Sequence, residues 1–356
     1  MQFSNRIQTK ATGMTTHQFD IRPSIIRGDP ADAYLHWTKE VMRLESLNPK
    51  VLMDFVPERD GILCGMEEVN SLLLNVLPKK EAESGIESLD NEAEVWGLRE
   101  GEEIKKGEPV LRIIANYASF ALYETSICGI ISSSTAWATA AKECVDAAGD
   151  KTVIAYGARH IHPNVAHILD YASVIGGCSS ASTVLGSRQS GRNPFGNMPH
   201  SLPLIFGDTV TAAQAFDRHM GMEIQRIVLV GTFGDEAEEA LKVSQALRNK
   251  LRGIRIDTPN ERGGVTPTMV NELRARLDQM NFRHVEIYVS GGLTPEKIKE
   301  FQDLRCAVNG YFVGSYISGA VPNDFTADIR EIEDKAVAKR GIIPGKLDSP
   351  RLLRII

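Results

Sequence analysis

Cysteine is scarce in this chain of 356 residues, and the five cysteines that it has are scattered. Their number is odd, and no two of them stand in a C-x-x-C arrangement. Disulfide frameworks and zinc knuckles both depend on regular cysteine spacing. The sequence therefore argues against both and indicates reduced thiols in an intracellular protein. The five positions are Cys64, Cys128, Cys144, Cys178 and Cys306.

Long apolar runs are also missing. No stretch approaches the roughly 18–20 apolar residues that are needed to span a bilayer. The first 18 residues, MQFSNRIQTKATGMTTHQ, contain no apolar signal core. The formal net charge of −6 at pH 7 argues against a general nucleic-acid binder. We therefore expect a cytoplasmic protein that binds neither membranes nor nucleic acid.

The length suits one barrel and a smaller domain. Residues 1–18 are polar and predicted to be flexible. A helix beginning at Asp32 to Tyr34, short strands, an acidic loop at 79–94 and a helix at 122–148 predict an N-terminal α/β domain with a connecting helix over 19–150. Residues 151–320 are predicted to form a (β/α) barrel. The tail, 321–356, returns to short extended pieces and is expected to pack on the N-terminal domain.

Three segments of the predicted barrel share one pattern, an apolar strand that ends in an acid or in glycine. They are GIRIDT at 253–258, VEIYVSGG at 285–292 and GYFVGS at 310–315. Helical patterns follow the first two, at about 267–280 and 294–303. Parallel β/α units have this appearance, and we expect an α/β fold with an irregular, TIM-like barrel. Further strands are expected at 153–156, 174–175, 202–206 and 227–230.

The ends of these strands carry groups that suit a sugar phosphate. Asp257 ends the first strand, and Gly291, Gly292 and Gly314 form turns after the next two. A carboxylate accepts hydrogen bonds from ribose hydroxyls, and glycine lets backbone N–H groups approach phosphate oxygens. Because strand ends meet at one mouth in such barrels, we expect these residues to lie together.

Two other segments carry candidate residues. Tyr156 and Arg159 follow a strand in YGARHIHP, where the aromatic ring can stack on a planar ligand and the guanidinium can bind its carboxylate or phosphate. His160 and His162 have no acid or cysteine nearby in sequence, so no protein-held metal site is predicted. The small-residue loop at 176–186 is a candidate anion nest. His200, after a proline turn, and Asp208, placed at a predicted strand end, complete the set.

Seven motifs in this order resemble the nicotinate phosphoribosyltransferase family, of type II phosphoribosyltransferase fold, and most of all its short archaeal and bacterial subgroup. They are YGARHIHP, GGCSSASTVLG, GNMPHSL, GDT, IRIDTPNERGG, VSGGLTPEKI and FVGS. The similarity extends to Tyr34 near the start and to AKRG at 338–341 near the end, and so spans about residues 25–345.

The resemblance implies a role for individual residues. In the catalytic set, His200 matches a histidine that ATP-coupled members phosphorylate, and Asp208 matches an acid that supports this histidine and the ribose site. Asp257, together with Arg255 of the substrate-binding set, matches the ribose and pyrophosphate binders. Among the other matches that bind substrates, Tyr156 stacks on the pyridine ring, Arg159 contacts the nicotinate or the donor, and Gly291, Gly292 and Gly314 cradle the 5′-phosphate. Lys339 and Arg340 match basic residues near the donor phosphates, and Tyr34 an aromatic that the neighbouring subunit supplies.

One position departs from the family pattern. The family commonly has an acid after its Gly-Gly-x turn, where this chain has Ser179. Ser179 and Ser182 are therefore predicted to contact the pyridine substrate as neutral groups. A quinolinate phosphoribosyltransferase, which would need a denser Arg and Lys cluster, and a non-catalytic paralogue that only binds ligand both remain open.

The reaction that the resemblance implies transfers phosphoribose from phosphoribosyl pyrophosphate to nicotinate, giving nicotinate mononucleotide and pyrophosphate for NAD biosynthesis. Mg²⁺ is expected to accompany the donor. Coupling to ATP hydrolysis through His200, as in a ligase, and ATP-independent transfer stay as equal alternatives. Because the counterpart of Tyr34 covers the partner's site, a homodimer or higher homo-oligomer with shared active sites is predicted.

Overall fold

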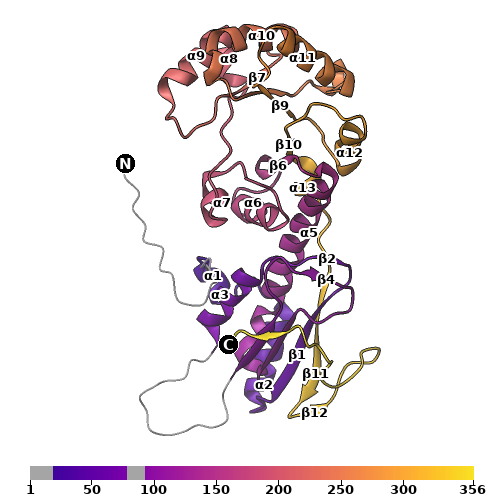
Figure 1. Ribbon diagram of the computed structural model, residues 1–356. Coiled ribbons are helices and arrows are strands. Elements are labelled where there is room, and N and C mark those ends of the chain that lie inside the picture. The colour runs from indigo at the N-terminus through magenta and orange to yellow at the C-terminus, as the bar shows by residue number, and fades with distance from the viewer. Residues whose placement is uncertain (1–18, 78–92) are drawn as a thin grey trace. The chain divides into compact units, whose positions relative to one another are not determined.

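The computed structural model describes residues 19–77 and 93–356, and it divides into two compact units. Unit 1 combines the chain up to Ser132 with Asn323–Ile356, and unit 2 is Ser133–Pro322. The division falls inside the long helix α5 (Glu124–Ala148), which the sequence predicts at 122–148 (Figure 1). The predicted flexible N-terminus and most of the predicted acidic loop lie outside the described residues.

Unit 1 is built around an antiparallel sheet that joins both ends of the chain. Its strands run in the order β12-β11-β1-β5-β3-β13. The central strand β1 is almost wholly buried, and it pairs on one side with β11 from the C-terminal tail. The expectation that the tail completes the N-terminal fold is confirmed (Figure 1). The strands are β1 (Lys50–Pro57), β3 (Glu94–Gly97), β5 (Leu111–Asn116), β11 (Phe325–Ile332), β12 (Lys335–Ala336) and β13 (Leu353–Arg354), with β2 (Gly61–Ile62) and β4 (Glu103–Ile104) as a separate pair.

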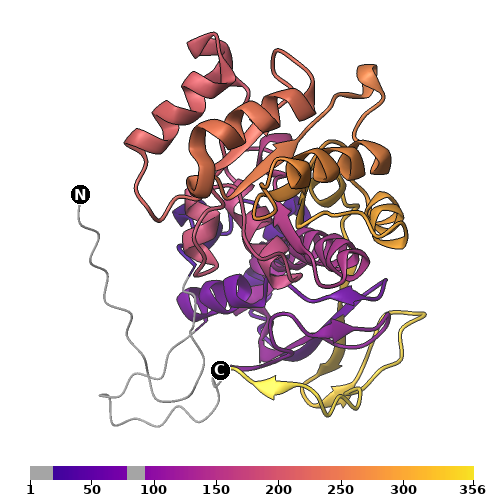
Figure 2. The same cartoon turned by 45° about the horizontal axis from the view of Figure 1, so that its top comes forward.

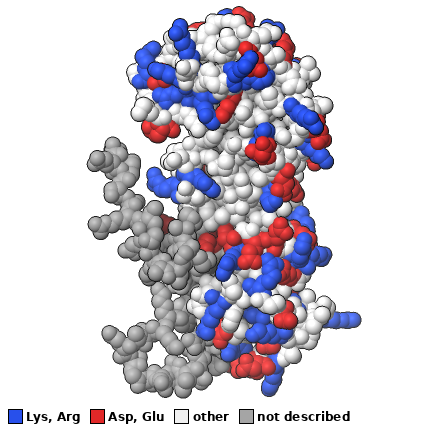
Figure 3. Space-filling view, in the orientation of Figure 1, with Lys and Arg blue, Asp and Glu red and all other residues white. Residues whose placement is uncertain are grey.

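The helices of unit 1 are α1 (Pro23–Ile26), α2 (Ala33–Leu44), α3 (Met66–Val76) and α4 (Tyr117–Phe120). Helix α2 matches the helix expected to open at Asp32. Among the residues of 19–77 and 93–356, no helix is both long and apolar enough to cross a membrane. On the face seen in Figure 3, positive and negative side chains are interspersed over most of the surface, and several acidic side chains lie next to one another near the middle of the view.

Unit 2 contains five parallel strands in the order β6-β10-β9-β8-β7. The expected barrel strands at 153–156, 227–230, 254–257, 285–289 and 310–313 are all present. Helices α10 to α12 lie against these strands (Figures 1 and 2). The strands are β6 (Thr152–Ala155), β7 (Ile227–Val230), β8 (Gly253–Ile256), β9 (Glu286–Val289) and β10 (Gly310–Val313). The helices are α6 (Ala166–Ile175), α7 (Val184–Gln189), α8 (Ser201–Phe206), α9 (Thr209–His219), α10 (Glu236–Leu247), α11 (Pro267–Gln279), α12 (Pro295–Asp303) and α13 (Ser315–Ser318).

Two irregular extended segments continue this sheet at its edges. Ser180 makes a parallel bridge to Ile154 of β6, and Met198 makes one to Val228 of β7. The two segments also meet, because the Phe195 N–H donates to the Ala181 carbonyl over 3.2 Å. The parallel sheet therefore closes on itself, and the expected irregular barrel is confirmed.

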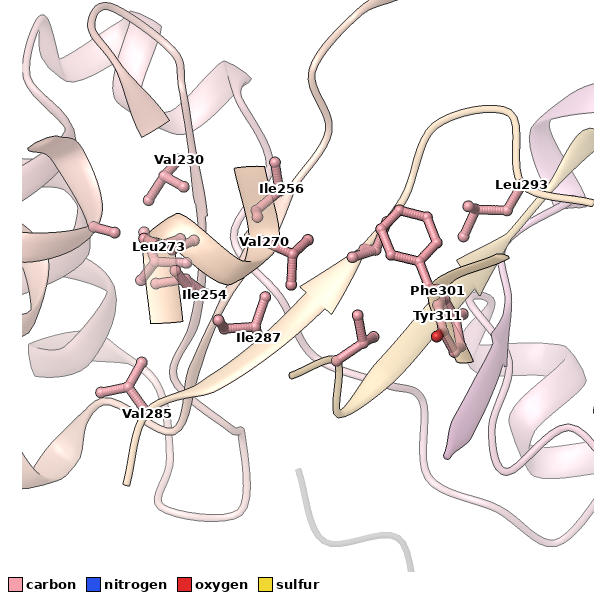
Figure 4. Packing of buried hydrophobic residues seen from close by; sticks show 14 of the residues in the cluster. Val230, Ile254, Ile256, Val270, Leu273, Val285, Ile287, Leu293, Phe301 and Tyr311 are labelled. Atoms are coloured by element: carbon pink, nitrogen blue, oxygen red, sulfur yellow. The ribbon is translucent and has the colours of Figure 1, made fainter. Parts of the chain in front are cut away.

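Side chains alternate between two cores along each strand, as the period of two requires. Ile254 and Ile256 of β8 pack outward with Val270 and Leu273 of α11 in the core between strands and helices (Figure 4). The opposite faces of the other strands form a second, small cluster of Ile154, Ile227, Tyr288 and Phe312. Arg255 lies between the two isoleucines in β8 and so faces this second side with its charge.

Two expected strands are wrong. Residues 174–175 end helix α6, and residues 202–206 form most of helix α8. Apolar runs this short cannot be told apart by periodicity. Pro203 sits in the first turn of α8, where its missing N–H costs no helical hydrogen bond. As a consequence, Asp208 follows a helix rather than a strand, and the small-residue loop after Gly176 does too.

Candidate active site

Side chains from several strand ends of unit 2 line one cavity of about 460 Å³. Every lining residue belongs to unit 2, so the cavity is a property of the barrel alone. The structure thus brings together eight of the predicted residues or turns at the ends of parallel strands and at the start of α8. They are Tyr156, Arg159, His200, Arg255, Asp257, Gly291, Gly292 and Gly314.

Arg255 is notable in this cavity because its guanidinium is buried and forms no ion pair with any residue that the structure describes. The residue is 3% exposed, and its Nε has no hydrogen-bond partner among these residues. Its Cζ lies 5.3 Å from the centre of the Tyr156 ring and 5.0 Å from that of Phe312. Aromatic faces stabilise a cation only in part, and a buried charge is costly unless it is paired. Arg255 therefore retains its capacity to bind an anionic group in the cavity.

The exposed Arg159 approaches the same aromatic ring. Its Cζ lies 5.2 Å from the Tyr156 centroid, and Tyr156 also packs edge-on against Phe312 at 5.6 Å. Tyr156 is thus held among two guanidinium groups and a second ring. The aromatic side chain and the two positive charges give this wall of the cavity the properties that a planar anionic ligand needs.

Asp257 lies two residues after Arg255 and beside a glycine turn. Gly291 has a φ of 98°, which disfavours other residues, and a Cβ there would stand 3.1 Å from the Asp257 Oδ1. Only glycine lets this turn approach the carboxylate without strain. Within the described part of the chain, no backbone hydrogen bond uses the N–H groups of Gly291, Gly292 or Gly314. These donors are therefore free for an anion or for water.

The imidazole of His200 has a single hydrogen-bond partner in the described residues, the hydroxyl of Thr232, whose Oγ1 lies 2.8 Å from the His200 Nδ1. Partial burial lowers the pKa of His200, and the charge of Arg255 acts in the same direction, while Asp257 and Glu239 oppose it. The neutral imidazole is therefore favoured near neutral pH. In that form one ring nitrogen has a lone pair available for a proton or an electrophile.

His160 and His162 are not placed as a metal pair. The His160 Nδ1 lies 3.2 Å from the Ser318 hydroxyl, and the His162 Nδ1 accepts from the Asn164 N–H at 3.2 Å. Over 19–77 and 93–356, no three His, Cys, Asp or Glu side chains gather as metal ligands would.

The structure does not bring Asp208 to His200. Asp208 caps helix α9, where its Oδ2 accepts from the Thr211 N–H at 2.6 Å, and this bond lowers its pKa. It lines a different cavity, of about 340 Å³, together with Lys242. The side chain that contacts His200 is that of Thr232, so the geometry gives no support to Asp208 as its acid.

The small-residue loop is already occupied by a carboxylate of the chain itself. The Asp170 Oδ2 accepts from the Thr183 N–H at 2.8 Å and from its hydroxyl at 2.6 Å. Burial raises the pKa of Asp170. The exposed Ser179 donates its hydroxyl to the Val153 carbonyl at 3.1 Å, and neither Ser179 nor Ser182 lines the cavity of His200. The expected anion nest is therefore filled by Asp170.

Three predicted residues belong to unit 1. The Lys339 Nζ lies 2.7 Å from the Asp328 Oδ1, and the exposed Tyr34 donates to the Asp32 Oδ2 at 3.4 Å. Arg340 is exposed. Because the cavity lies within unit 2, the roles of these three residues remain predictions.

Sequence reasoning missed three residues of this region. Thr232 and Ser290 follow apolar strands, and the rule that located Asp257 could have located them as well. Glu239 had no such signal, because its side chain reaches the loop after β7 from helix α10.

Comparison with known proteins gives matches over most of the chain. Residues 32–135 match the N-terminal domain of quinolinate phosphoribosyl transferase, and residues 137–328 match its C-terminal domain. A crystal structure of nicotinate-nucleotide pyrophosphorylase from Pyrococcus furiosus is 37% identical, with a TM-score of 0.82, over 95% of this chain and 82% of that one. Human nicotinic acid phosphoribosyltransferase shares the fold, with a TM-score of 0.66 and 18% identity over 89% of this chain and 77% of its own.

Curated relatives carry a related name. Nicotinate phosphoribosyltransferase pncB2 of Mycobacterium tuberculosis is 30% identical over 229 residues, which are 63% of this chain and 48% of that protein. The chain thus spans about half the length of the curated relatives that it matches.

Proposed function

Because the chain belongs to the quinolinate phosphoribosyl transferase family, we propose that it transfers phosphoribose from phosphoribosyl pyrophosphate to nicotinate in NAD biosynthesis. The observation that carries this proposal is Arg255, a buried cation without an anionic partner in the described part of the chain, two residues from Asp257 at the mouth of the barrel. A substrate that carries both anionic groups and ribose hydroxyls would bind Arg255 through the anion and Asp257 through the hydroxyls.

The residues would act by binding and by neutralising charge. Transfer of phosphoribose to a ring nitrogen builds positive charge at the ribose C1 as pyrophosphate leaves, so the protein must align the ring nitrogen and stabilise the leaving group. Asp257 would accept from the ribose hydroxyls, and the free N–H groups of the glycine turns would bind the 5′-phosphate. Arg255 and Arg159 would bind the carboxylate or pyrophosphate. No general base is required, since the pyridine nitrogen is itself nucleophilic.

The charge of the cavity supports nicotinate over quinolinate. Arg159 and Arg255 are the only Arg or Lys side chains that line the cavity in the described residues, and Asp257 subtracts one charge. Nicotinate carries one carboxylate, whereas quinolinate carries two. Quinolinate, with loss of its second carboxylate as CO₂, stays the second candidate because the family models and the Pyrococcus structure carry related names. A non-catalytic binder is the third, and the complete set of Arg255, Asp257 and His200 speaks against it.

A magnesium ion would enter with the donor. Mg²⁺ prefers oxygen ligands and commonly combines one or two carboxylates with substrate phosphates. Asp257 is the one carboxylate on the cavity wall among the described residues, so the donor's own oxygens would supply most of the ligands. Bound there, the ion would add positive charge to the departing pyrophosphate.

His200 would either accept a phosphoryl group from ATP or bind the donor pyrophosphate. Its depressed pKa supports both, because a neutral imidazole can act as a nucleophile or as a hydrogen-bond partner. Incubation with γ-labelled ATP separates them. Acid-labile label that disappears in His200→Ala supports coupling to ATP, and ATP-independent product formation without label supports binding only.

An exposed apolar face on α2 supports a shared active site. Tyr34, Trp37, Val41 and Leu44 are 55%, 69%, 58% and 65% exposed, and their spacing puts them on one side of the helix. A stripe of this kind is typical of a covered face. We therefore propose a homodimer or a multiple of it, with Tyr34 covering the partner's substrate. A fully active monomer at micromolar concentration in mass measurements would refute this assembly.

The deciding experiment is an assay of purified protein with phosphoribosyl pyrophosphate and nicotinate, nicotinamide or quinolinate, each with and without ATP. Product from nicotinate, and none from nicotinamide or quinolinate, supports the proposal. Product and CO₂ from quinolinate would replace it by the second candidate. Binding of phosphoribosyl pyrophosphate without any product would leave the third.

A further inference from the structure

Glu239 is a buried carboxylate that forms no ion pair with any described residue. It lies in the first turn of α10, is 7% exposed, and its carboxylate accepts five hydrogen bonds. Its Oε1 accepts from the N–H groups of Phe233 (2.8 Å) and Gly234 (2.9 Å). Its Oε2 accepts from the N–H groups of Gly231 (3.0 Å) and Thr232 (3.2 Å) and from the Thr209 hydroxyl (3.1 Å).

Four successive backbone N–H groups of the loop after β7 therefore converge on one side chain. Gly231, with a φ of 83°, starts this loop, and a Cβ there would stand 2.9 Å from the Glu236 Cγ. Four peptide dipoles and one hydroxyl, rather than an arginine or lysine, satisfy the carboxylate. Because a buried charge is costly, its full hydrogen bonding fixes the conformation of the loop tightly.

The loop that Glu239 holds also carries the partner of His200. Thr232 offers its N–H to Glu239 and places its Oγ1 2.8 Å from the His200 Nδ1. No protein group in the described residues bonds the other ring nitrogen, Nε2. The Thr232 hydroxyl can donate to Nδ1 or accept from it, so the bond is compatible with either tautomer of His200 and fixes the orientation of its ring.

We propose that Glu239 is a positioning residue for His200, which acts through the Gly231–Gly234 loop and the Thr232 hydroxyl. It holds the imidazole in one orientation, in which Nε2 is the ring nitrogen without a protein partner among the described residues. The consequence for turnover rests on the proposed function of this cavity, whereas the state of the imidazole does not.

The variants follow from the geometry. In Glu239→Gln the amide NH₂ must face at least two N–H donors, whichever way the amide turns, so one side of the loop is released. Thr232→Val removes the hydroxyl with little change of shape, and Thr232→Ser retains it. Glu238→Gln is the matched control, because Glu238 is an exposed neighbour on the same helix that pairs with Lys242 at 2.6 Å.

The direct readout is the ¹⁵N chemical shifts of the His200 ring, identified among the eight histidines by the signal that His200→Ala removes. In the parent protein we expect the shifts of one ring orientation, with Nδ1 hydrogen-bonded to Thr232. Glu239→Gln and Thr232→Val should both give averaged shifts of exchanging ring orientations, while Thr232→Ser and Glu238→Gln should match the parent. The double variant should resemble either single one, because both changes break the same path.

Turnover provides the second readout. Misplacement of a reacting group by about 1 Å can cost on the order of a hundredfold. We expect Glu239→Gln and Thr232→Val to lower kcat by roughly ten- to a hundredfold with little change in the KM for phosphoribosyl pyrophosphate. Averaged shifts with unchanged kcat would support the positioning role and would remove His200 from the proposed reaction.

Parent-like shifts in Glu239→Gln, alongside averaged shifts in Thr232→Val, would overturn the proposal, as would additive effects in the double variant. If Glu239→Gln does not fold, Glu239→Asp tests the same point, because the shorter carboxylate cannot reach both halves of the loop. Parent-like ring shifts in a folded Glu239→Asp protein would equally overturn it.

Discussion

Two arginines are buried to the same degree, 3% exposed, one in each unit, and their surroundings differ completely. Arg112 of unit 1 binds both oxygens of Asp54 at 2.6 and 2.9 Å and also donates to the Leu347 carbonyl. Arg255 of unit 2 lies over two aromatic rings and has no carboxylate partner within residues 19–77 and 93–356. A buried cation with every bond satisfied stabilises the fold, whereas one left open indicates a place for a ligand.

Strand register accounts for this contrast. Arg112 stands directly opposite Asp54 in the antiparallel pair of β5 and β1. Arg255 stands beside Leu229 of β7 and Tyr288 of β9, so no acid is available at its level of the sheet. Two arginines that are equally buried can therefore have opposite roles: one stabilises the fold because the neighbouring strand provides an acid, and the other is left to bind a ligand because the neighbouring strands provide none.

The largest effect is expected from breaking the satisfied pair. Asp54→Ala leaves Arg112 buried and uncompensated, and loss of one partner of such a pair costs about 3–5 kcal/mol. Urea denaturation followed by circular dichroism should show this loss in the free energy of unfolding. Glu40→Ala, which breaks an exposed pair with Arg43, is the control and should change little. Equal stability of Asp54→Ala and the parent would show that the pair does not hold unit 1 together.

Replacing the unsatisfied arginine should separate activity from stability. Arg255→Met should lose charge-assisted hydrogen bonds to the substrate that stabilise the transition state by about 3 kcal/mol. This loss corresponds to a decrease in kcat/KM of roughly two decades. The free energy of unfolding should stay equal or rise, because an apolar side chain replaces an unpaired buried charge. Arg252→Met, an exposed neighbour, should leave kcat/KM unchanged. A strongly destabilised Arg255→Met with parent-like activity would reverse the interpretation of Arg255.

A smaller loss of activity than in Arg255→Met is expected when the nearby Asp257 is replaced. Asp257→Ala removes the proposed partner of the ribose hydroxyls, and a hydrogen bond to a charged group contributes about 1.5–3 kcal/mol. Steady-state kinetics with varied phosphoribosyl pyrophosphate should show kcat/KM lower by roughly one to two decades. The exposed Asp303→Ala serves as control. Efficiency within twofold of the parent would exclude Asp257 from donor binding.

The smallest effect is expected on the pKa of His200, which the unpaired charge of Arg255 lowers. Because Arg255 contributes to the lowered pKa of His200, Arg255→Met should raise that pKa, and Asp257→Asn should lower it further. NMR titration of the ring measures both directions. An equal pKa of His200 in Arg255→Met and in the parent would show that the charge of Arg255 is screened from His200.

The same shift predicts a weak pH dependence of stability. A histidine whose folded pKa lies below its usual 6.5 is charged more readily when unfolded, so the protein loses stability as the pH falls from about 6.5 through the folded pKa. Above that window the contribution is fully present. Denaturation between pH 5 and 8, compared with His200→Gln, should show a shallower slope in the variant.

Much of the barrel could be predicted from the sequence, for a physical reason. Parallel strands buried on both faces appear as short apolar runs, and their C-terminal ends must meet, so Asp257 and the glycine turns at Gly291 and Gly314 could be assigned to one mouth. Arg255 was identified only through the family resemblance, although the alternation within GIRID puts it on the same face as Asp257. Where apolar runs were short and irregular, at 174–175 and 202–206, periodicity could not distinguish helix from strand, and the expectation was wrong.

The sequence by itself determined the residue types and their order along the strands, because these follow from local period and burial. It also led to the expectation that the tail packs on the N-terminal domain, but the pairing of β11 with β1 comes from the tertiary structure. Only the tertiary structure decided which side chains contact one another. Asp170 fills the loop that looked like an open anion nest, Asp208 caps a helix instead of meeting His200, and Glu239 reaches from α10 to the loop of Thr232. Such pairings join residues on different elements, and their geometry is set by how the chain packs rather than by any spacing that the sequence contains.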